Sequence, residues 1–146
     1  MKRKGSAVWQ GGLKDGKGTV STESGVLRDA QYSFSTRFEN GAGTNPEELI
    51  AAAHAGCFSM ALSAVLGESN LKPERIETTA TTTMEKTDAG MTVTAIHLDV
   101  TADIPGADAA AFQAAADKAK KTCPISRLLS AATITMDARL RAGSRA

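Results

Sequence analysis

The stretch from Thr44 to Leu66 constrains the fold most, because it predicts one long helix that is apolar nearly all round. Its start carries the residues of a helix N-terminus. Either Thr44 or Asn45 can cap the helix, Pro46 suits the first helical position, and the two glutamates that follow favour the positive end of the helix dipole. Further along, the polar side chains are those of His54, Ser59 and Ser63. They do not line up on one face, and a helix of this kind is either buried or in a membrane.

We interpret this stretch as a central core helix, covered on every side by the rest of the chain. It only reaches the lower limit of about 17 to 25 apolar residues for crossing a bilayer. It is also rich in alanine, contains a histidine and has no second hydrophobic segment beside it. We therefore expect no membrane association. The N-terminus lacks an apolar signal region, which predicts a cytoplasmic protein.

Length and charge narrow the remaining possibilities. A chain of 146 residues predicts a single domain, residues 1–146, with a real core. Seventeen basic residues against sixteen acidic ones give a net charge of +1, and no long basic run occurs. Nucleic acid is therefore not an expected partner.

The residues before the central helix read as strands. Ala7–Trp9 and Gly16–Thr22 are short β-prone segments, and Tyr32–Phe38 alternates aromatic residues with polar ones. A strand over Tyr32–Phe38 would put Arg37 on the face opposite the aromatic rings.

The residues after the central helix predict a hairpin, a helix and a last strand. Arg75–Lys86 and Met91–Ile104 are joined by a tight turn, and the second strand carries an apolar face. That face consists of Ile96, Leu98, Val100, Ala102 and Ile104. The order β-β-β-α-β-β-α-β, with hairpins in place of regular βαβ units, predicts an α+β fold.

The last third adds finer expectations. Asp108 can cap a helix that runs to Lys121, with Ala110, Ala114 and Ala115 toward the core. A short helical turn over Arg127–Ser130 and a strand over Thr133–Leu140 follow. The tail, residues 141–146, is expected to fray.

Two cysteines are the candidates for chemistry. Cys57 in the middle of the buried helix can be a space-filling hydrophobe, as most buried cysteines are. Cys123, at the end of an amphipathic helix, is expected to be the more accessible of the two, and it can equally be inert. Together they have the layout of peroxide chemistry, a buried cysteine and a resolving one. A thiol reacts as its thiolate, and Arg37 is a candidate for the cation that this requires.

Other chemistry has weaker support. His54 lies three residues before Cys57 on the same helix face, but a Cys-His hydrolase would also need the ring against the thiol and an oxyanion hole. We expect a core role for His54 and a solvated His97. Two cysteines and two histidines scattered singly, without zinc-type spacing, predict no metal site.

Five motifs resemble the OsmC/Ohr family of thiol peroxidases. They are Gly18–Gly25, Thr36–Phe38, Gly43–Ile50, Ala52–Leu62 and Cys123–Ser126. The resemblance covers nearly the whole chain and is nearer to the OsmC branch than to the organic hydroperoxide resistance (Ohr) branch.

The resemblance implies a fold in which two chains intertwine as a homodimer, with antiparallel β-sheets wrapped around central helices. It also implies reduction of hydroperoxides, organic ones preferentially, with an external thiol or dithiol as reductant and no cofactor. By the same resemblance Cys57 is the peroxidatic nucleophile, Cys123 the resolving thiol, Arg37 the thiolate-stabilising cation and Glu47 the carboxylate that orients Arg37. We expect Phe58, Met60 and the early aromatic residues to form an apolar pocket for the peroxide.

Two rival readings stay open at this point. One is a thiol redox sensor or small-ligand-binding stress protein, and the other is a structural protein with two inert cysteines. Glu47 and Cys57 are ten residues apart, which is about 15 Å along one straight helix. We therefore expect Glu47 and Arg37 of one chain to approach Cys57 of the other across a two-fold axis.

Overall fold

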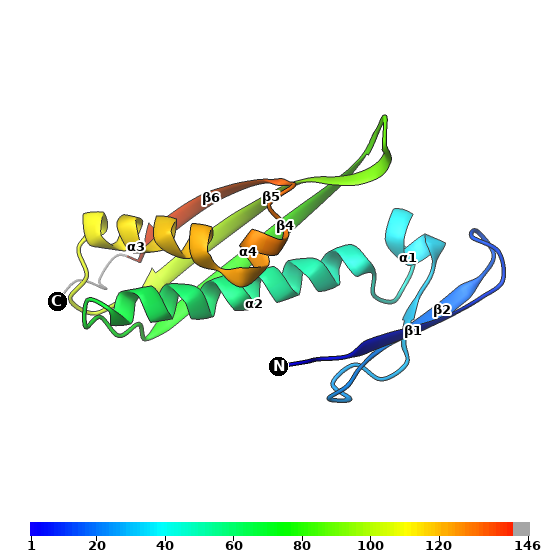
Figure 1. The fold of residues 1–146 in the computed structure, drawn as a ribbon, viewed down its shortest axis with the longest axis horizontal. Coiled ribbons are helices and arrows are strands. Elements are labelled where there is room, and N and C mark those ends of the chain that lie inside the picture. Colours follow the sequence, from blue (N-terminus) through cyan, green and yellow to red (C-terminus); the bar gives the residue numbers. More distant parts are fainter. Residues whose placement is uncertain (142–146) are drawn as a thin grey trace. The chain divides into compact units, whose positions relative to one another are not determined.

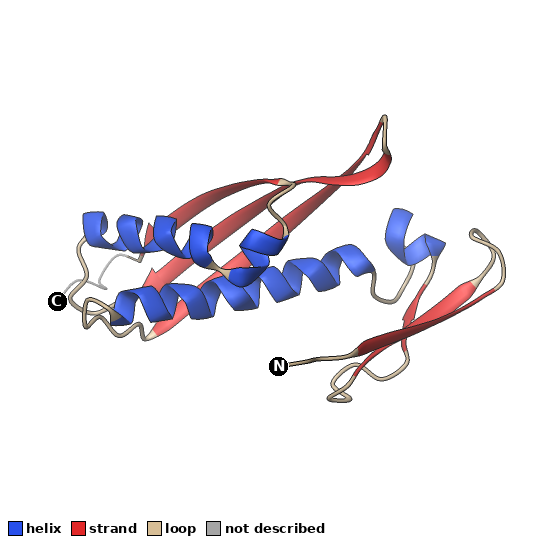
Figure 2. Cartoon of the chain, viewed as in Figure 1, coloured by secondary structure: helices blue, strands red, loops and turns tan. Residues whose placement is uncertain are grey.

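The computed structural model describes residues 1–141 and has an α+β fold, as predicted. The chain divides into two compact units, Met1–Leu49 and Ile50–Ala146, and each is described by itself. The elements are β1 (Gly5–Gln10), β2 (Lys17–Thr22), β3 (Ala30–Tyr32), α1 (Phe34–Phe38), α2 (Pro46–Gly67), β4 (Arg75–Thr87), β5 (Gly90–Asp103), α3 (Ala109–Thr122), α4 (Pro124–Leu128) and β6 (Thr133–Leu140) (Figures 1 and 2).

The unit Met1–Leu49 contains an antiparallel sheet in the order β1-β2-β3. Trp9 of β1 and Tyr32 of β3 both pair with Gly18 of β2, and their ring centroids are 5.4 Å apart. A Cβ atom at Gly18 would lie 2.5 Å from the Tyr32 ring and 2.7 Å from the Trp9 ring. The glycine therefore lets two aromatic rings close over the middle strand.

The predicted strand over Tyr32–Phe38 is wrong, because β3 ends at Tyr32 and α1 begins at Phe34. Ser33 forms a capping box with Thr36: the Ser33 hydroxyl accepts from the Thr36 N–H, and the Thr36 hydroxyl accepts from the Ser33 N–H. Phe34 and Phe38 then meet one helical turn apart, with centroids 4.9 Å apart. A spacing of four fits both an alternating strand and a helix, and the cap selects the helix.

Helix α2 has the predicted bounds and cap. The Asn45 side chain accepts a hydrogen bond from the Glu48 N–H at 2.8 Å, and Pro46 is the first helical residue. The prediction that the chain covers every face is wrong for residues 1–141. The buried side chains of α2 form one stripe with a spacing of four residues: His54, Phe58, Leu62 and Leu66.

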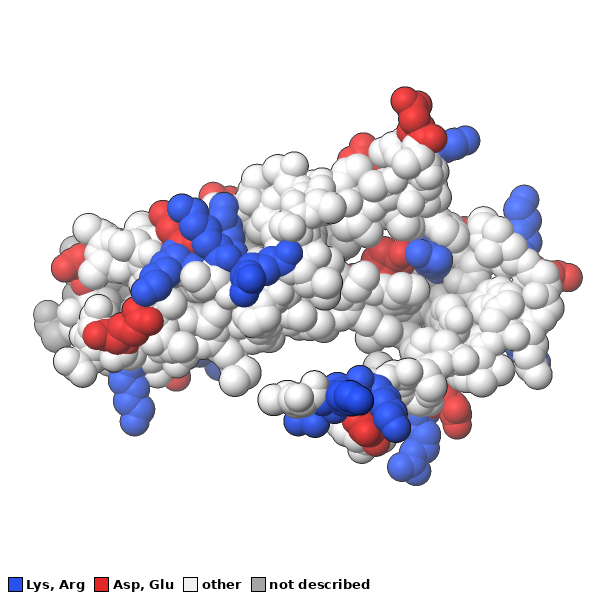
Figure 3. All heavy atoms as spheres, viewed as in Figure 1, with Lys and Arg blue, Asp and Glu red and all other residues white. Residues whose placement is uncertain are grey.

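The opposite side of α2 is exposed and uncharged. Ala53, Gly56, Met60 and Ala64 follow one another along it, and Met60 is 77% exposed. Figure 3 shows an uncharged surface along the middle of the helix. By length and composition α2 could cross a membrane, a test that a core helix of a soluble protein also passes. The residues that the structure describes therefore leave one apolar side of α2 exposed to solvent.

The unit Ile50–Ala146 holds the main core, built from α2, β5 and α3. The predicted apolar face of β5 is confirmed, with Ile96, Leu98 and Val100 fully buried. Strands β4 and β5 form the predicted antiparallel hairpin. Strand β6 pairs with β5 in parallel, so this sheet is mixed and not antiparallel throughout. The parallel pairing follows from the long connection through α3 and α4, which returns the chain to the end of the sheet where β5 began.

Helix α3 begins at its predicted cap, since Asp108 accepts from the Ala111 N–H at 2.7 Å. Its buried side chains are Phe112, Ala115, Ala116 and Ala119. Ala110 and Ala114, predicted to face the core, are exposed. The bulky Phe112 sets the buried stripe, and the two alanines lie outside its spacing.

The end of the chain differs in two details from expectation. The short helix predicted over Arg127–Ser130 begins three residues earlier, as α4, because Pro124 suits a first helical position. Arg141 donates its backbone N–H to Ala102 at 2.9 Å and pairs with Asp103 at 3.2 Å. The rest of the tail predicted to fray, residues 142–146, lies outside the described residues.

Candidate active site

Two free cysteines meet in the unit Ile50–Ala146. The Sγ atoms of Cys57 and Cys123 are 2.9 Å apart, although 66 residues separate them in the sequence. Cys57 lies on α2, and Cys123 stands between α3 and α4. A disulfide needs an S–S distance of about 2.05 Å, so a small movement would join them.

The predicted accessibilities of the two thiols are reversed. Cys123 is fully buried, whereas Cys57 is half-buried. The reason is the buried stripe of α3: Cys123 comes four residues after Ala119 and continues the core face that begins at Phe112. Cys57 lies beside the buried stripe of α2 and next to Gly56, where an added Cβ atom would meet nothing within 4 Å. Cys57 therefore carries the more accessible of the two sulfurs.

Burial raises the pKa of the Cys57 thiol above its ordinary value of 9.0, and the neighbouring Cys123 thiol raises it further. A hydrogen bond with the Ile125 backbone acts in the other direction and lowers it. These groups all belong to the unit Ile50–Ala146. A guanidinium or ammonium cation lowers the pKa of a thiol that it neighbours and favours the reactive thiolate.

The unit Met1–Leu49 holds such a cation. Arg37 donates from Nε to Glu47 Oε1 at 2.9 Å, and its terminal nitrogen lies 2.7 Å from the same oxygen. The Glu47 side chain is 14% exposed, and the Arg37 side chain is 39% exposed. Glu47 Oε2 is buried without a hydrogen-bond partner among the described residues. A partly open guanidinium fixed by a more buried carboxylate is suited to meeting an anion.

Aromatic rings surround this guanidinium. Arg37 lines a cavity of about 260 Å³ together with Trp9, Tyr32, Phe34 and Phe38. Its guanidinium carbon lies 5.4 Å from the centre of the Phe38 ring. The early aromatic residues therefore form a pocket, as predicted. Phe58 does not join an open pocket, because it is fully buried in the core.

Of the four predicted site residues, the structure brings together two pairs. Cys57 meets Cys123 in one unit, and Arg37 meets Glu47 in the other. The pairs come from different motifs of the sequence: one consists of two thiols, and the other of a guanidinium held by a carboxylate.

The comparisons with known proteins agree on one family. A family model described as OsmC-like protein matches residues 39–138. The chain belongs to this family. Peroxiredoxin OsmC of Escherichia coli (strain K12) is 54% identical over 139 residues, which are 95% of this chain and 96% of the relative. The organic hydroperoxide resistance protein of Xanthomonas axonopodis pv. citri (strain 306) is 36% identical over 87 residues, 59% of each chain.

Solved structures agree on the fold. An organic hydroperoxide resistance protein OsmC from Legionella pneumophila has a TM-score of 0.72 and 24% identity, covering 92% of this chain and 96% of that one. The recognition of the OsmC/Ohr family from the five motifs is thereby confirmed.

This OsmC-like chain also contains a buried polar contact, between His54 and Ser126, that the sequence did not predict. His54 Nε2 lies 2.7 Å from Ser126 Oγ, and both side chains are buried. Burial lowers the pKa of His54, so the ring is neutral. His54 thus has a core role, as expected, and it bonds Ser126 in place of Cys57. No local pattern in the sequence points to this contact, because it joins segments 72 residues apart.

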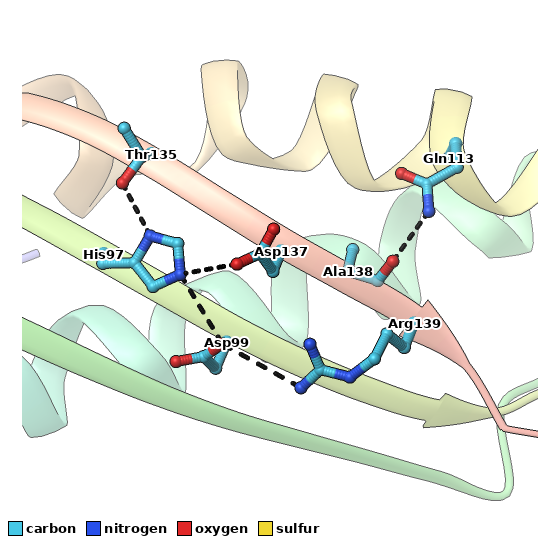
Figure 4. A network of polar contacts seen from close by, with 7 residues as sticks. All are labelled: His97, Asp99, Gln113, Thr135, Asp137, Ala138 and Arg139. Atoms are coloured by element: carbon cyan, nitrogen blue, oxygen red, sulfur yellow. Dashed lines mark hydrogen bonds and ion pairs between the residues drawn. The ribbon is translucent and has the colours of Figure 1, made fainter.

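His97 lies on the polar face of the mixed sheet, and it has partners where solvation was predicted (Figure 4). Its Nδ1 is 2.6 Å from Thr135 Oγ1, and its Nε2 is 3.2 Å from Asp137 and 3.5 Å from Asp99. Asp99 and Asp137 are cross-strand partners, and Arg139 lies 3.9 Å from Asp99.

The three side chains His97, Asp99 and Asp137 could hold a metal ion by their spacing, with ligand atoms within 4.8 Å of one another. However, the imidazole and the Arg139 guanidinium already face these carboxylates (Figure 4). The network therefore accounts for the cluster without an ion.

Proposed function

We propose that this protein is a thiol-dependent hydroperoxide reductase. The observation that carries the proposal is the 2.9 Å separation between Cys57 Sγ and Cys123 Sγ, one half-buried and one buried. The names of its relatives, peroxiredoxin OsmC and organic hydroperoxide resistance protein, support the same chemistry.

The reaction uses both sulfurs. Cys57 thiolate attacks the distal oxygen of the hydroperoxide, the O–O bond breaks, and the alkoxide leaves as the alcohol after taking a proton. Cys57 is then a sulfenic acid. Cys123 attacks that sulfur, the S–O bond breaks, water leaves and a disulfide forms. An external thiol or dithiol reduces the disulfide by exchange, so one peroxide consumes two thiols.

In this proposal Arg37 supplies the cation for the Cys57 thiolate, and Glu47 fixes the guanidinium. Support comes from their ion pair at 2.7 Å and from the raised pKa of Cys57 in its own unit. The exposed apolar side of α2 supports a homodimer, because such a face gains free energy by meeting a second copy. We place Cys57 and Cys123 of one chain against Arg37 and Glu47 of its partner.

The aromatic cavity beside Arg37 supports a preference for organic hydroperoxides. Trp9, Tyr32 and Phe34 offer apolar surface to an alkyl group, whereas hydrogen peroxide gains nothing from such a surface. Met60, exposed on α2, can add to this surface in a dimer. In this proposal the uncharged face of α2 is a dimer interface, and the protein acts in the cytoplasm.

A redox sensor is the second candidate, favoured by the raised pKa of Cys57. A thiol with so little thiolate at neutral pH would form the same disulfide slowly, as a signal. The two functions differ in rate and share the chemistry.

A stopped-flow experiment separates these candidates. The reduced protein is mixed with an alkyl hydroperoxide or with hydrogen peroxide, and peroxide loss is followed with a dithiol reductant present. A peroxidase consumes many equivalents and prefers the alkyl substrate. A sensor consumes peroxide far more slowly under the same conditions, and a protein with inert cysteines consumes none. Cys57→Ser is the matched control.

A further inference from the structure

The buried pair His54 and Ser126 connects the same two elements as the pair of thiols. His54 is 0% exposed and Ser126 is 4% exposed, and the bond between them spans 72 residues of sequence. His54 lies three residues before Cys57 on α2, and Ser126 lies three residues after Cys123 on α4. Each polar residue is therefore about one helical turn from one of the sulfurs.

The hydrogen bond between His54 and Ser126 attaches α4 to α2. The chain bends at Cys123, which ends α3 and begins α4, and its backbone is held on both sides: Cys123 N–H donates to Ala119 O at 2.9 Å, and Arg127 N–H donates to Cys123 O at 3.0 Å. Fixing Ser126 therefore also fixes Cys123. His54 Nδ1 is buried without a partner among residues 1–141, so the contact with Ser126 is the polar attachment of the ring.

The resolving step is sensitive to this attachment. Once Cys57 carries a sulfenic oxygen, Cys123 has to attack the Cys57 sulfur opposite the leaving oxygen, and the two sulfurs must close from 2.9 Å to a bond of about 2.05 Å. A displacement of about 1 Å of an attacking group can cost about a hundredfold in rate. The attack of peroxide on Cys57, by contrast, does not require Cys123.

We propose that His54 and Ser126 are positioning residues, which hold the resolving Cys123 against Cys57 and thereby set the rate of disulfide formation. The inference rests on the proposed peroxidase function and extends it. Fast resolution limits the lifetime of the sulfenic acid, so this buried hydrogen bond protects Cys57 from oxidation to the sulfinic acid.

Four variants test this role. Ser126→Ala removes the hydroxyl, and Ser126→Thr keeps it. The double variant His54→Phe with Ser126→Ala removes both polar partners, so that no buried group is left unpaired if the single variant does not fold. Ser59→Ala is the matched control, because Ser59 bonds Thr78 at 2.8 Å and links α2 to β4, away from Cys123.

A single turnover with one equivalent of alkyl hydroperoxide gives the readout. Mass spectrometry with dimedone trapping measures the sulfenic acid and the disulfide over time. We expect Ser126→Ala and the double variant to form the disulfide at least about tenfold more slowly. Their rate of peroxide consumption should stay within about twofold, and their Cys57 should reach the sulfinic acid at lower peroxide. Ser126→Thr and Ser59→Ala should resemble the original protein.

Disulfide formation at the original rate in the double variant would overturn the proposal. Equal slowing in Ser59→Ala would also overturn it, by showing a general loss of structure. Diamide oxidation of the reduced protein keeps the test separate from peroxidase activity. If the original protein consumed no peroxide, the proposed function would fail, while a slower diamide-driven disulfide in Ser126→Ala would still support the positioning role.

Discussion

Helix α2 carries one of the two paired cysteines and helix α3 leads to the other, but the two helices differ in how the described residues cover them. Helix α3 buries Phe112, Ala115, Ala116 and Ala119 and exposes charged residues such as Asp117 and Lys118. Helix α2 buries every fourth residue from His54 to Leu66 and exposes alanine, glycine and methionine on its other side. Among residues 1–141, the apolar face of α3 is therefore covered, whereas α2 keeps an exposed apolar side.

We propose that this difference indicates where the active site is completed. Cys123, at the end of α3, has all its surroundings within its unit and is fully buried. Cys57, on α2, is half-buried and has its pKa raised by the groups around it. In the proposed dimer, a second copy would cover the exposed side of α2 and bring the Arg37 guanidinium to Cys57.

The largest expected effect separates the two cysteines. Cys57→Ser should abolish turnover, because the oxygen-accepting sulfur is lost. Cys123→Ser should still consume about one equivalent of peroxide and then accumulate oxidised Cys57. Peroxide assays with a dithiol reductant and mass spectrometry of the product measure both. Normal turnover in the Cys123→Ser variant would show that Cys123 is not the resolving thiol.

Matched alanine substitutions compare the exposed sides of the helices. Ala64→Glu puts a charge on the open side of α2 and should raise the dimer dissociation constant at least about a hundredfold, because an unpaired charge resists burial. Ala114→Glu on the exposed side of α3 should leave it within about twofold. Analytical ultracentrifugation measures the dissociation constants of the two variants. Equal dissociation constants would mean that α2 does not form the dimer interface.

Arg37→Ala tests the cation supplied to α2. We expect peroxide attack to slow by about tenfold to a hundredfold, because the pKa of Cys57 rises when its cation is removed. Arg37→Lys should restore part of the rate, because Arg37 uses two nitrogens on Glu47 and an ammonium cannot reproduce that fork. An unchanged rate in Arg37→Ala would exclude the role.

The pH dependence of Cys57 alkylation is the smallest and most local test. In the monomeric Ala64→Glu variant, burial should keep the alkylation midpoint above 9.0. In the dimer, Arg37 should move the midpoint below that value. The raised pKa also makes the free energy of unfolding depend on pH, in the opposite direction to a paired carboxylate. The protonated Cys57 thiol stabilises the fold at pH values below its pKa in the unfolded chain. This contribution is lost as the pH rises through its pKa in the folded protein. Identical midpoints in the two proteins would contradict the account.

Much of the fold followed from local signals in the sequence. Asn45 and Pro46 marked the beginning of α2, Asp108 marked α3, and alternation over Ile96–Ile104 marked the buried face of β5. Each of these signals acts over a few residues, where the physical rules are strongest. The two thiols were also found from the sequence, although their roles came from family resemblance.

The errors came from positions where two rules compete or where distant contacts decide. Phe34 and Phe38 satisfy both a strand and a helix, and the Ser33 cap settles the choice. The burial of Cys123 required extending the stripe from Phe112, and the pairing of His54 with Ser126 joins segments 72 residues apart. Side-chain contacts over such separations are set by packing, which the spacing along one element does not reveal.

The most direct test of a site shared between two chains is complementation between two inactive variants. Cys57→Ser and Arg37→Ala chains are unfolded together, refolded and assayed, with mass spectrometry confirming mixed dimers. A mixed dimer has one intact site, so an equal mixture should recover about a quarter of the original activity. No recovery in confirmed mixed dimers would place all four residues in one chain and contradict the account.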